Sequence, residues 1–274
     1  MSHLKKTVIT SSPEKLSDQL REVWKYRELL LVLAYRDFRL KYAQAFLGIA
    51  WAVLNPVLNL FLLSFVFHYI SDVETSNTPP LLFTMIGLVG WTYFSEVFSG
   101  AGDAVLSAQQ MVRKIYFPRL ILPLSKAITA LIDLGVALML LLGTWAVFGL
   151  QISSRIIFFP LFLLIAMLTA LTGGIWLSAL TIRYRDFRYI SPVLLRLGLF
   201  VTPIAYASTE VPEHWRSLFY LNPLALAIEG FRWSLLDGVP FPEEGWLGCV
   251  FLIFFFIGGL YYFSKMEAVI ADII

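Results

Sequence analysis

Long apolar runs separated by short polar segments dominate the hydrophobic pattern of the chain. A helix needs about 20 apolar residues to cross the hydrocarbon core of a bilayer, and six runs are long enough. We predict spanning helices at about 47–70, 80–108, 121–148, 156–182, 189–206 and 246–263. Asn55-Pro56 should kink the first of them. The expected fold is an all-α polytopic membrane protein with six transmembrane helices.

Residues 1–46 precede the first span and form a separate cytosolic and interfacial segment, with 47–274 as the transmembrane domain. Ser12-Pro13-Glu14 is typical of a helix start. Farther on, apolar residues recur at helical spacing while polar ones take other faces. The apolar set is Leu31, Tyr35, Phe38, Tyr42 and Ala45, and the polar set is Arg36, Arg39, Lys41 and Gln44. This pattern predicts an amphipathic helix in the headgroup layer; the alternative is a helix of a soluble core.

An apolar segment between the last two predicted spans, at about 208–236, is interrupted by proline and charge. Its interrupting residues are Glu210, Pro212, Glu213, Arg216, Pro223, Glu229 and Arg232. Broken backbone at membrane depth is tolerated only against protein or a water-filled cavity. We therefore predict a re-entrant pair of short helices hinged around Asn222-Pro223. The alternative is an ordinary extramembrane loop.

Composition and charge fix the class and the orientation. Hydrophobic residues make up 58% of the 274 residues, charged residues 15%, and the mean hydropathy is +0.75, which leaves no room for a sizeable soluble domain. Most Lys and Arg residues fall before residue 47, in 113–126 and in 183–188, whereas the loops on the other side carry acids. The positive-inside rule then places both termini in the cytosol. The single cysteine, Cys249, excludes a disulfide framework.

A basic and aromatic segment, Gln109 to Ser125, connects the second and third predicted spans. We expect it to project Arg113, Lys114, Tyr116, Phe117 and Arg119 into the cytosol as a docking surface, bounded by Pro118 and Pro123. The alternative is a positive-inside loop with aromatic residues of the membrane interface.

Several charged residues fall inside the predicted spans, where an unpaired charge costs about 2.5 to 3.5 kcal/mol at the helix centre. Asp133 lies near the middle of the third span and Arg196 inside the fifth. We expect these two to form a structural ion pair; the alternative is that they line a polar path. Glu96 and Asp103 share one face of the second span with Gly100 between them, which suits a pore wall or a close helix contact.

Aromatic residues cluster where a path for substrate would run. The candidates for substrate contact are Trp51, Trp91, Tyr93, Phe94, Phe98 and Trp176. Ring faces can stack on sugars, although most membrane aromatics are packing or interface residues. His3, His68 and His214 are scattered, and the sequence contains neither HExxH nor GxxxxGK[ST]. We therefore expect no metal site, no catalysis and no bound cofactor in this chain.

Several short motifs occur in an order and spacing that resemble a known family over nearly the whole chain. They are Arg36-Asp37-Phe38, Lys41-Tyr42, Leu47-Gly48, Trp51, Asn55-Pro56, Val112 to Arg119, Leu122-Pro123-Leu124-Ser125, Arg183 to Phe187, Thr202-Pro203, and the strings VPEHWR, YLNP and EGFRW. The chain resembles the membrane subunits of ABC-2 type exporters, in the group that moves lipid-linked O-antigen, capsule or teichoic acid chains. One departure is Ala45, where the family often has a small hydroxyl residue.

The resemblance implies a role for each segment. The helix before the first span would be interfacial, and Arg113, Lys114, Tyr116, Phe117, Pro118 and Arg119 would enter a groove on a separate ATPase subunit that holds ATP and Mg. The segment 208–236 would form outer gate helices, with Pro212, Trp215, Tyr220, Asn222 and Pro223 in the gate. Two copies in a bacterial inner membrane would enclose one channel above two ATPases, with a lipid-linked glycan as substrate and no nucleic acid partner.

Three rival functions stay open. An ABC-2 permease for drugs or small lipids would share the architecture and differ in the export defect that follows deletion. A membrane-embedded transferase would use Glu96 and Asp103 on a lipid-phosphate substrate, and the purified single chain would then be active. An ion-coupled carrier would use Asp133 or Glu96 as a proton site and would work without ATP.

Overall fold

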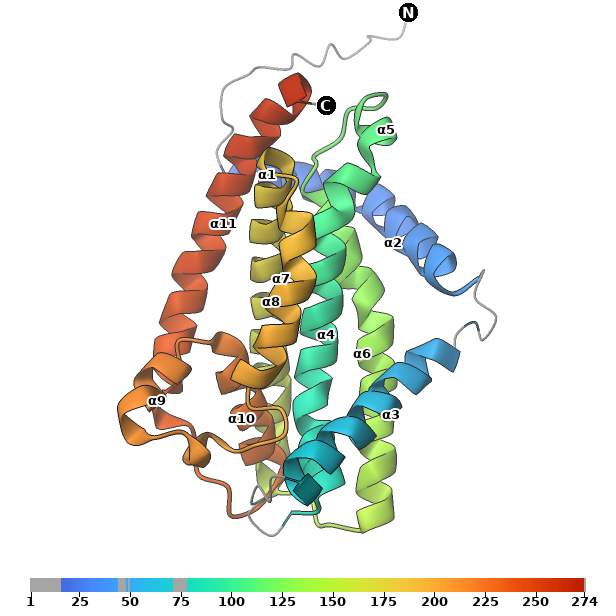
Figure 1. The fold of residues 1–274 in the computed structure, drawn as a ribbon. Helices are drawn as coiled ribbons and strands as arrows, with labels where there is room; N and C mark the ends of the chain where they lie inside the picture. The colour runs from blue at the N-terminus through green and yellow to red at the C-terminus, as the bar shows by residue number, and fades with distance from the viewer. Residues whose placement is uncertain (1–15, 44–47, 49, 71–77, 274) are drawn as a thin grey trace, which may run out of the picture.

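The computed structural model describes residues 16–43, 48, 50–70 and 78–273, and this part of the chain is helical without strands. Its elements are α1 (Leu16–Lys25), α2 (Arg27–Tyr42), α3 (Ala50–Ser64), η1 (Phe65–Ile70), α4 (Pro80–Ser107), α5 (Gln109–Val112), α6 (Ile121–Phe148), η2 (Ser154–Phe158), α7 (Phe159–Arg183), α8 (Phe187–Val201), η3 (Ser208–Glu210), α9 (Glu213–Phe219), α10 (Pro223–Leu235), η4 (Glu243–Gly245) and α11 (Trp246–Ile273). The long helices run side by side as a bundle (Figure 1). The predicted all-α class is confirmed for the described residues.

Helix α4 is the centre of the bundle, because α3, α6, α7, α8 and α10 all pack against it. Small residues let its neighbours approach closely: Gly87 faces the backbone of Ile204, and Gly102 faces the Leu177 side chain. Packing of this kind holds helices together in lipid, where the hydrophobic effect between helices is absent.

Five helical segments of the described chain are long and apolar enough to cross a membrane. They are Ala50–Tyr69, Pro80–Ser107, Ile121–Phe148, Ser154–Arg183 and Glu243–Glu267. The spans predicted at 80–108 and 121–148 match α4 and α6 closely. Gly149, at φ 62°, ends α6 in the left-handed conformation that favours glycine.

The predicted span at 189–206 is wrong in length. Helix α8 has 15 residues and ends at Val201, so at about 1.5 Å per residue it covers about 22 Å of a hydrocarbon core of about 30 Å. Thr202 is extended, with φ −90° and ψ 138°, because the residue before a proline avoids helical backbone. Pro203 therefore ends the helix short of the predicted limit at residue 206.

The N-terminal amphipathic pattern is confirmed as a helix, but its buried face differs from the prediction. Leu31 and Tyr35 are 58% and 63% exposed. The buried residues of α2 are Leu33, Ala34, Asp37 and Tyr42, of which only Tyr42 belongs to the predicted apolar set, and α2 packs against α6. The expected helix start at residues 12–14, with Gln44, Ala45 and the beginning of the first predicted span, lies outside the described residues.

The segment 208–236 contains two short helices, α9 and α10, separated at Asn222-Pro223 as predicted. The Asn222 carboxamide oxygen accepts a hydrogen bond from the Leu224 amide at 3.1 Å, and Pro223 is the first helical residue, which is a favourable helix start. Both helices lie beside the lower part of α11, at the end of the bundle opposite α5 (Figure 1). Whether the pair is re-entrant stays a prediction.

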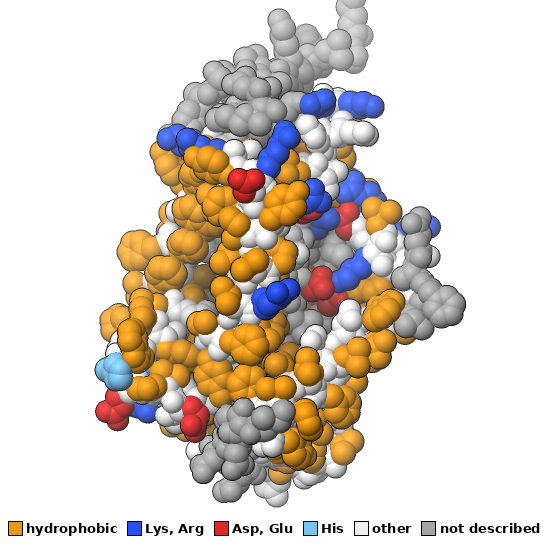
Figure 2. Space-filling view, in the orientation of Figure 1, with side chains coloured by type: hydrophobic (Ala, Val, Ile, Leu, Met, Phe, Trp, Pro, Cys, Tyr) orange, Lys and Arg blue, Asp and Glu red, His pale blue; other side chains and the backbone are white. Residues whose placement is uncertain are grey.

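Lys and Arg side chains gather toward the end of the molecule where α1 and α5 lie, and hydrophobic side chains cover most of the middle (Figure 2). A few charged side chains lie on the same face at mid-height, among the hydrophobic ones. Charged side chains among hydrophobic ones are candidates for a functional site.

Candidate functional site

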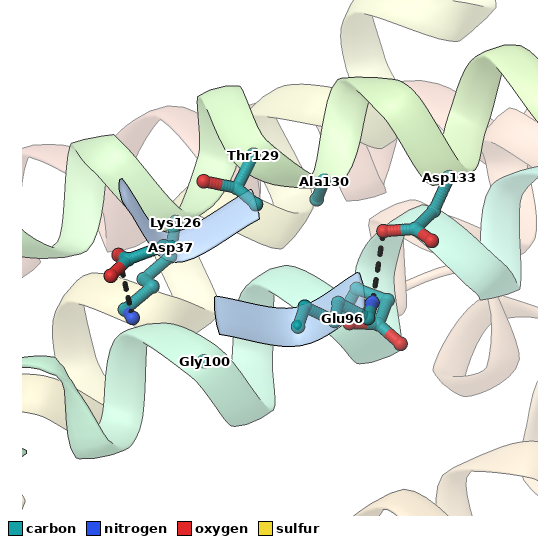
Figure 3. Close-up of a pocket in the computed structure, with 8 residues that line it drawn as sticks. Asp37, Glu96, Gly100, Lys126, Thr129, Ala130 and Asp133 are labelled. Carbon is teal, nitrogen blue, oxygen red and sulfur yellow. Dashed lines mark hydrogen bonds and ion pairs between the residues drawn. The ribbon is translucent and has the colours of Figure 1, made fainter. Parts of the chain in front are cut away.

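A charged pocket of about 180 Å³ lies where α2 crosses α4 and α6. Its lining residues are Asp37, Lys41, Glu96, Gly100, Lys126, Thr129, Ala130 and Asp133. Asp133 of α6 and Glu96 of α4 point toward the same place, and Lys126 points toward Asp37 (Figure 3). The Lys126 stem packs beside Gly100, where an added Cβ would lie at an ordinary contact distance of 3.4 Å from the Lys126 Cβ.

Lys41 joins the two acids from different helices. Its Nζ donates to the Glu96 Oε2 at 2.7 Å and to the Asp133 Oδ2 at 3.0 Å. Burial lowers the pKa of Lys41, but the two carboxylates outweigh burial and raise that pKa above its usual value. The Lys41 ammonium therefore keeps its charge at neutral pH.

Tyr42 adds a second contact between α2 and Asp133, because its hydroxyl donates to the Asp133 Oδ1. Burial and this hydrogen bond raise the pKa of Tyr42 to about 12. The neutral hydroxyl is consequently a permanent donor at physiological pH, and Asp133 has an α2 partner on each carboxylate oxygen.

In the other half of the pocket, the turns of α2 that precede Lys41 are bonded to α6. The Lys126 Nζ lies 2.7 Å from the Asp37 Oδ2, and the Asp37 Oδ1 also accepts from Arg36 at 2.9 Å. The Thr129 hydroxyl lies 3.1 Å from the Ala34 carbonyl oxygen and 2.9 Å from that of Ser125. These contacts attach α2 to the bundle by polar bonds.

The expected ion pair between Asp133 and Arg196 is not formed. Asp133 pairs with Lys41 and Tyr42, and Arg196 is exposed on α8. The sequence pattern places Lys41 on a polar face of its helix and includes Asp37 in a family motif, but it predicts no contact between helices for Lys41, Asp37 or Lys126. The available signal for these contacts was the run of charged residues on a helix that precedes spans with acidic residues. The sequence pattern does not show which turns of the neighbouring helices face each other, so it could not predict the pairs.

Glu96 and Asp103 lie on one side of α4 as predicted, yet they have different partners. The Arg188 guanidinium, at the start of α8, lies 2.9 Å from the Asp103 Oδ2, whereas Glu96 faces α2. Among the described residues no group of His, Cys, Asp or Glu could hold a metal ion.

The predicted docking segment is exposed only in part. Arg113, Lys114, Ile115 and Tyr116 are exposed. The expectation that Phe117 projects outward is wrong, because its side chain is 2% exposed in an apolar cluster with Leu120 and Phe263.

The end of the same segment is also held against the bundle. Pro118 is buried. The Arg119 amide donates to the Glu267 Oε1 at 2.8 Å, and the Arg119 guanidinium lies 3.6 Å from the same oxygen. The exposed tip is thus restricted to residues 113–116.

At the opposite end, a fully buried guanidinium holds the chain that follows α8. Arg232 of α10 is 0% exposed. It donates to the Ile204 carbonyl at 2.8 Å and to the Tyr206 carbonyl and Glu229 carboxylate at 2.9 Å each. Its guanidinium carbon also lies 3.7 Å from the centre of the Phe83 ring.

Other predicted gate residues contribute to the same region. The Asn222 amide nitrogen donates to the Thr202 hydroxyl at 3.2 Å, and the Tyr220 hydroxyl donates to that of Ser208 at 2.9 Å. Pro212 and Trp215 are exposed on and beside α9. Their role in gating stays a prediction.

The six aromatic path candidates fall into two groups: Tyr93 and Trp176 donate hydrogen bonds to backbone carbonyls, and the other four are described by their exposure or ring contacts. Trp51 is 40% exposed on α3, and the Trp91, Phe94 and Phe98 rings follow one another along α4 at 5.6 and 5.5 Å. Tyr93 is buried and donates to the Ala127 carbonyl, while the Trp176 indole nitrogen donates to the Phe255 carbonyl of α11 at 2.7 Å. Contact of any of them with substrate stays a prediction.

Comparisons with known proteins agree with this architecture. The family model described as "ABC-2 type transporter" matches residues 28–236. The chain is 31% identical over 215 residues to the "O-antigen export system permease protein RfbA" of Myxococcus xanthus, covering 78% of this chain and 82% of that one. It is also 25% identical over 250 residues to the protein of the same name in Klebsiella pneumoniae, covering 90% and 95%.

A relative with a different name matches over a similar length. The "Polysialic acid transport protein KpsM" of Escherichia coli is 25% identical over 252 residues, covering 88% of this chain and 94% of that one. The helical bundle, the apolar spans and the family match over most of the sequence lead to one conclusion. The chain belongs to the membrane-subunit family of ABC-2 type transporters.

Proposed function

We propose that this chain is the permease subunit of an ATP-driven exporter that moves a lipid-linked polysaccharide across the bacterial cytoplasmic membrane. Two copies enclose the path, and two separate ATPase subunits supply ATP hydrolysis. The chain itself performs no chemistry on the glycan.

The observation that carries this proposal is the agreement among its relatives. Permeases named for O-antigen export and for polysialic acid transport both match from 88% to 90% of this chain. Both names concern the movement of a polysaccharide, one as export and the other as transport, and they differ in the glycan. We therefore assign the substrate class and leave the individual glycan open.

A second copy is favoured by polar side chains along α4 that the described bundle leaves accessible. Thr92, Ser95, Glu96, Ser99 and Asp103 recur at helical spacing and are half-buried or exposed. Polar groups at membrane depth are costly against lipid, so this stripe is better suited to a water-filled path. A second copy facing it would close that path.

Two neighbouring helices carry polar residues of the same kind. Asn55 and Asn59 are exposed on α3, one turn and two turns after Trp51. Arg196 is exposed on α8. We propose that these side chains also face the path between the two copies, so that α3, α4 and α8 form the wall contributed by each protomer.

An ATPase partner is favoured by the exposed tip at residues 113–116. The tip combines two cations with Ile115 and Tyr116 and lies at the basic end of the bundle, near α1 (Figures 1 and 2). By the positive-inside rule this end is cytosolic. No phosphate-binding GxxxxGK[ST] motif occurs in the sequence, so nucleotide binding is assigned to the partner.

Deletion of the gene followed by complementation tests the substrate class. The deletion strain is expected to lose the polysaccharide from its surface and to accumulate it inside the cell, and the intact gene restores export. Normal surface polysaccharide together with raised drug sensitivity would instead support the drug-efflux permease.

Copurification tests the partner. Arg113→Glu combined with Lys114→Glu should weaken ATPase binding in a pull-down from detergent, whereas Arg155→Glu at the other end of the bundle serves as a matched charge control. Tyr116→Ala is a second probe of the tip, while Phe117 is excluded because its burial couples it to folding. Full transport by the single chain without an ATPase would refute the proposal and favour the transferase or the carrier.

A further inference from the structure

Helix α11 contacts both the predicted ATPase-docking segment and the predicted outer gate. It runs along the whole bundle, from the level of α9 to the end where α5 lies (Figure 1). From Gly248 to Glu267 the helix spans about 28 Å, at about 1.5 Å per residue. The whole of this helix, Trp246–Ile273, lies beyond residue 236, where the family match ends.

The cytosolic end of α11 is bonded to the docking segment. Glu267 accepts the Arg119 amide at 2.8 Å and pairs with its guanidinium at 3.6 Å, and both side chains are less than one-fifth exposed. Phe263 and Met266 are buried in the same apolar cluster as Phe117. Movement of the segment that follows the exposed tip must therefore displace α11 or break these contacts.

The outer end of α11 touches the backbone at the break between α9 and α10. A Cβ added at Gly248 would lie 2.6 Å from the Tyr220 carbonyl oxygen and 3.3 Å from the Pro223 Cα. Just before the helix, the Ser217 hydroxyl of α9 donates to the Glu244 carboxylate at 3.2 Å. The hinge of the outer pair is thus in direct contact with the helix backbone.

Between its ends, α11 is supported by α7. The Trp176 ring stacks on Phe255 and Tyr262 at 4.9 and 5.3 Å, and its indole nitrogen donates to the Phe255 carbonyl at 2.7 Å. A Cβ at Gly259 would lie 2.7 Å from that nitrogen. Such packing favours movement of α11 as a unit over local bending.

We propose that α11 transmits ATP-driven movement from the docking segment to the hinge of the outer helix pair, with Glu267 and Gly248 as positioning residues at its two ends. The proposal rests on the proposed function, because it requires an ATPase that moves the docking segment. It adds a route of about 28 Å, between Gly248 and Glu267, that avoids the path between the two copies.

The accessibility of α9 reports the movement. Leu218 is 56% exposed on α9, so a Leu218→Cys probe in a Cys249→Ser background can be labelled with a membrane-impermeant maleimide. The complex of the permease and its ATPase in proteoliposomes is labelled without nucleotide and with ATP plus vanadate. In the parent we expect ATP to change the labelling rate at least about fivefold, the lower range of allosteric coupling.

Substitutions at either end of α11 should remove this response. Glu267→Ala and Gly248→Ala are each expected to bring the ratio of labelling rates close to one, while the ATPase still copurifies. Lys265→Ala, an exposed neighbour of Glu267, and Gly258→Ala, whose Cβ would meet only the Trp176 ring at 3.4 Å, should keep the parent's ratio. A variant that only loosened the fold would change labelling with and without ATP alike.

Each remaining outcome decides the matter. If Glu267→Ala does not assemble, Glu267→Gln keeps an acceptor for the Arg119 amide without the charge, and a reduced ratio supports the proposal. A parental ratio in the Glu267 and Gly248 variants overturns it and leaves the proposed function intact. An ATP-insensitive parent also overturns it, while the proposed function is decided separately by the deletion and copurification experiments.

Discussion

Two ionic sites of this protein use charge in opposite ways. At the outer site, Arg232 and Glu229 belong to one helix, both are buried, and the guanidinium is bonded to two backbone carbonyls and stacked on Phe83. At the inner site, charges from α2, α4 and α6 meet around a pocket, where the side chains of Lys41 and Glu96 are 35% and 44% exposed.

The difference indicates which site is fixed and which can change. Breaking a buried pair leaves an uncompensated charge, so the outer site resists rearrangement. Half-exposed charges on separate helices can exchange partners or become hydrated at little cost. We therefore regard the outer site as a fixed anchor of the backbone after α8 and the inner site as an adjustable contact between α2 and the bundle.

Arg232→Leu is the strongest way to break this comparison. Removing the guanidinium leaves Glu229 buried without its charge partner and the Ile204 carbonyl without this donor, so we expect a loss of about 3 to 5 kcal/mol of stability. Thermal unfolding of the detergent-purified protein measures it. Arg216→Leu, which removes a half-buried arginine of α9 bonded to the Thr209 and Val211 carbonyls, should have a much smaller effect.

A double variant shows which contacts of the outer site matter. Glu229→Leu together with Arg232→Leu removes the charge imbalance but still leaves the backbone carbonyls without their donor. We expect only partial recovery of the melting temperature. Full recovery would mean that the ion pair, and not the backbone bonds, accounts for the loss.

Asp133→Ala should have the next largest effect. Asp133 is buried and accepts from both Lys41 and Tyr42, so its loss leaves the Tyr42 hydroxyl without this acceptor, at a cost of about 1 to 3 kcal/mol. The melting temperature is the measurement. Asp133→Asn keeps an acceptor for Tyr42 and should recover part of the loss; a cost equal to that of Arg232→Leu would make the inner site a fixed anchor as well.

Thr129→Val probes the polar contact between α2 and α6 without changing charge. The hydroxyl reaches the Ala34 carbonyl of α2 and the Ser125 carbonyl of its own helix, and a net loss of about 0.5 to 1.5 kcal/mol is expected. Thr144→Val, whose hydroxyl bonds only to the Leu141 carbonyl of its own helix, is the control. Equal shifts in melting temperature would show that the contact across the two helices adds nothing.

The smallest effect is expected for the half-exposed pair of Lys41 and Glu96. A double-mutant cycle with Lys41→Met and Glu96→Gln should give a coupling energy of about 0.2 to 1 kcal/mol. This value should fall in about 1 M salt, where the screening length is about 3 Å. A salt-independent coupling would mean that the pair is effectively buried.

Sequence reasoning located the helices best where one residue type fixes their end. The limits of α6 match the span predicted from its apolar run, and the left-handed Gly149 is the physical reason that the helix ends there. The overlong fifth span followed from hydropathy alone, although Thr202-Pro203 carried the signal that ends α8. Hydropathy indicates which segments can enter a membrane, whereas the backbone preferences of residues such as glycine and proline determine where a helix ends.

The contents of the candidate site were less predictable. Lys41 is bonded to acids 55 and 92 residues away along the chain, and periodicity within one helix gives no information about which face meets which neighbour. Phe117 was predicted as part of an exposed motif, and only the packing of α11 reveals that its ring faces inward. The charged residues could be identified from the sequence, but which of them pair could be seen only in the tertiary structure.

The short helix α8 has a consequence for how this chain can diverge. Because Pro203 ends the helix and Arg232 then satisfies the Ile204 and Tyr206 carbonyls of the non-helical chain that follows, neither residue is free to change alone. We expect loss of Arg232 to be tolerated only where Pro203 is lost too, so that α8 can continue through the residues that are now non-helical. Homologous sequences should therefore keep both residues or replace both together.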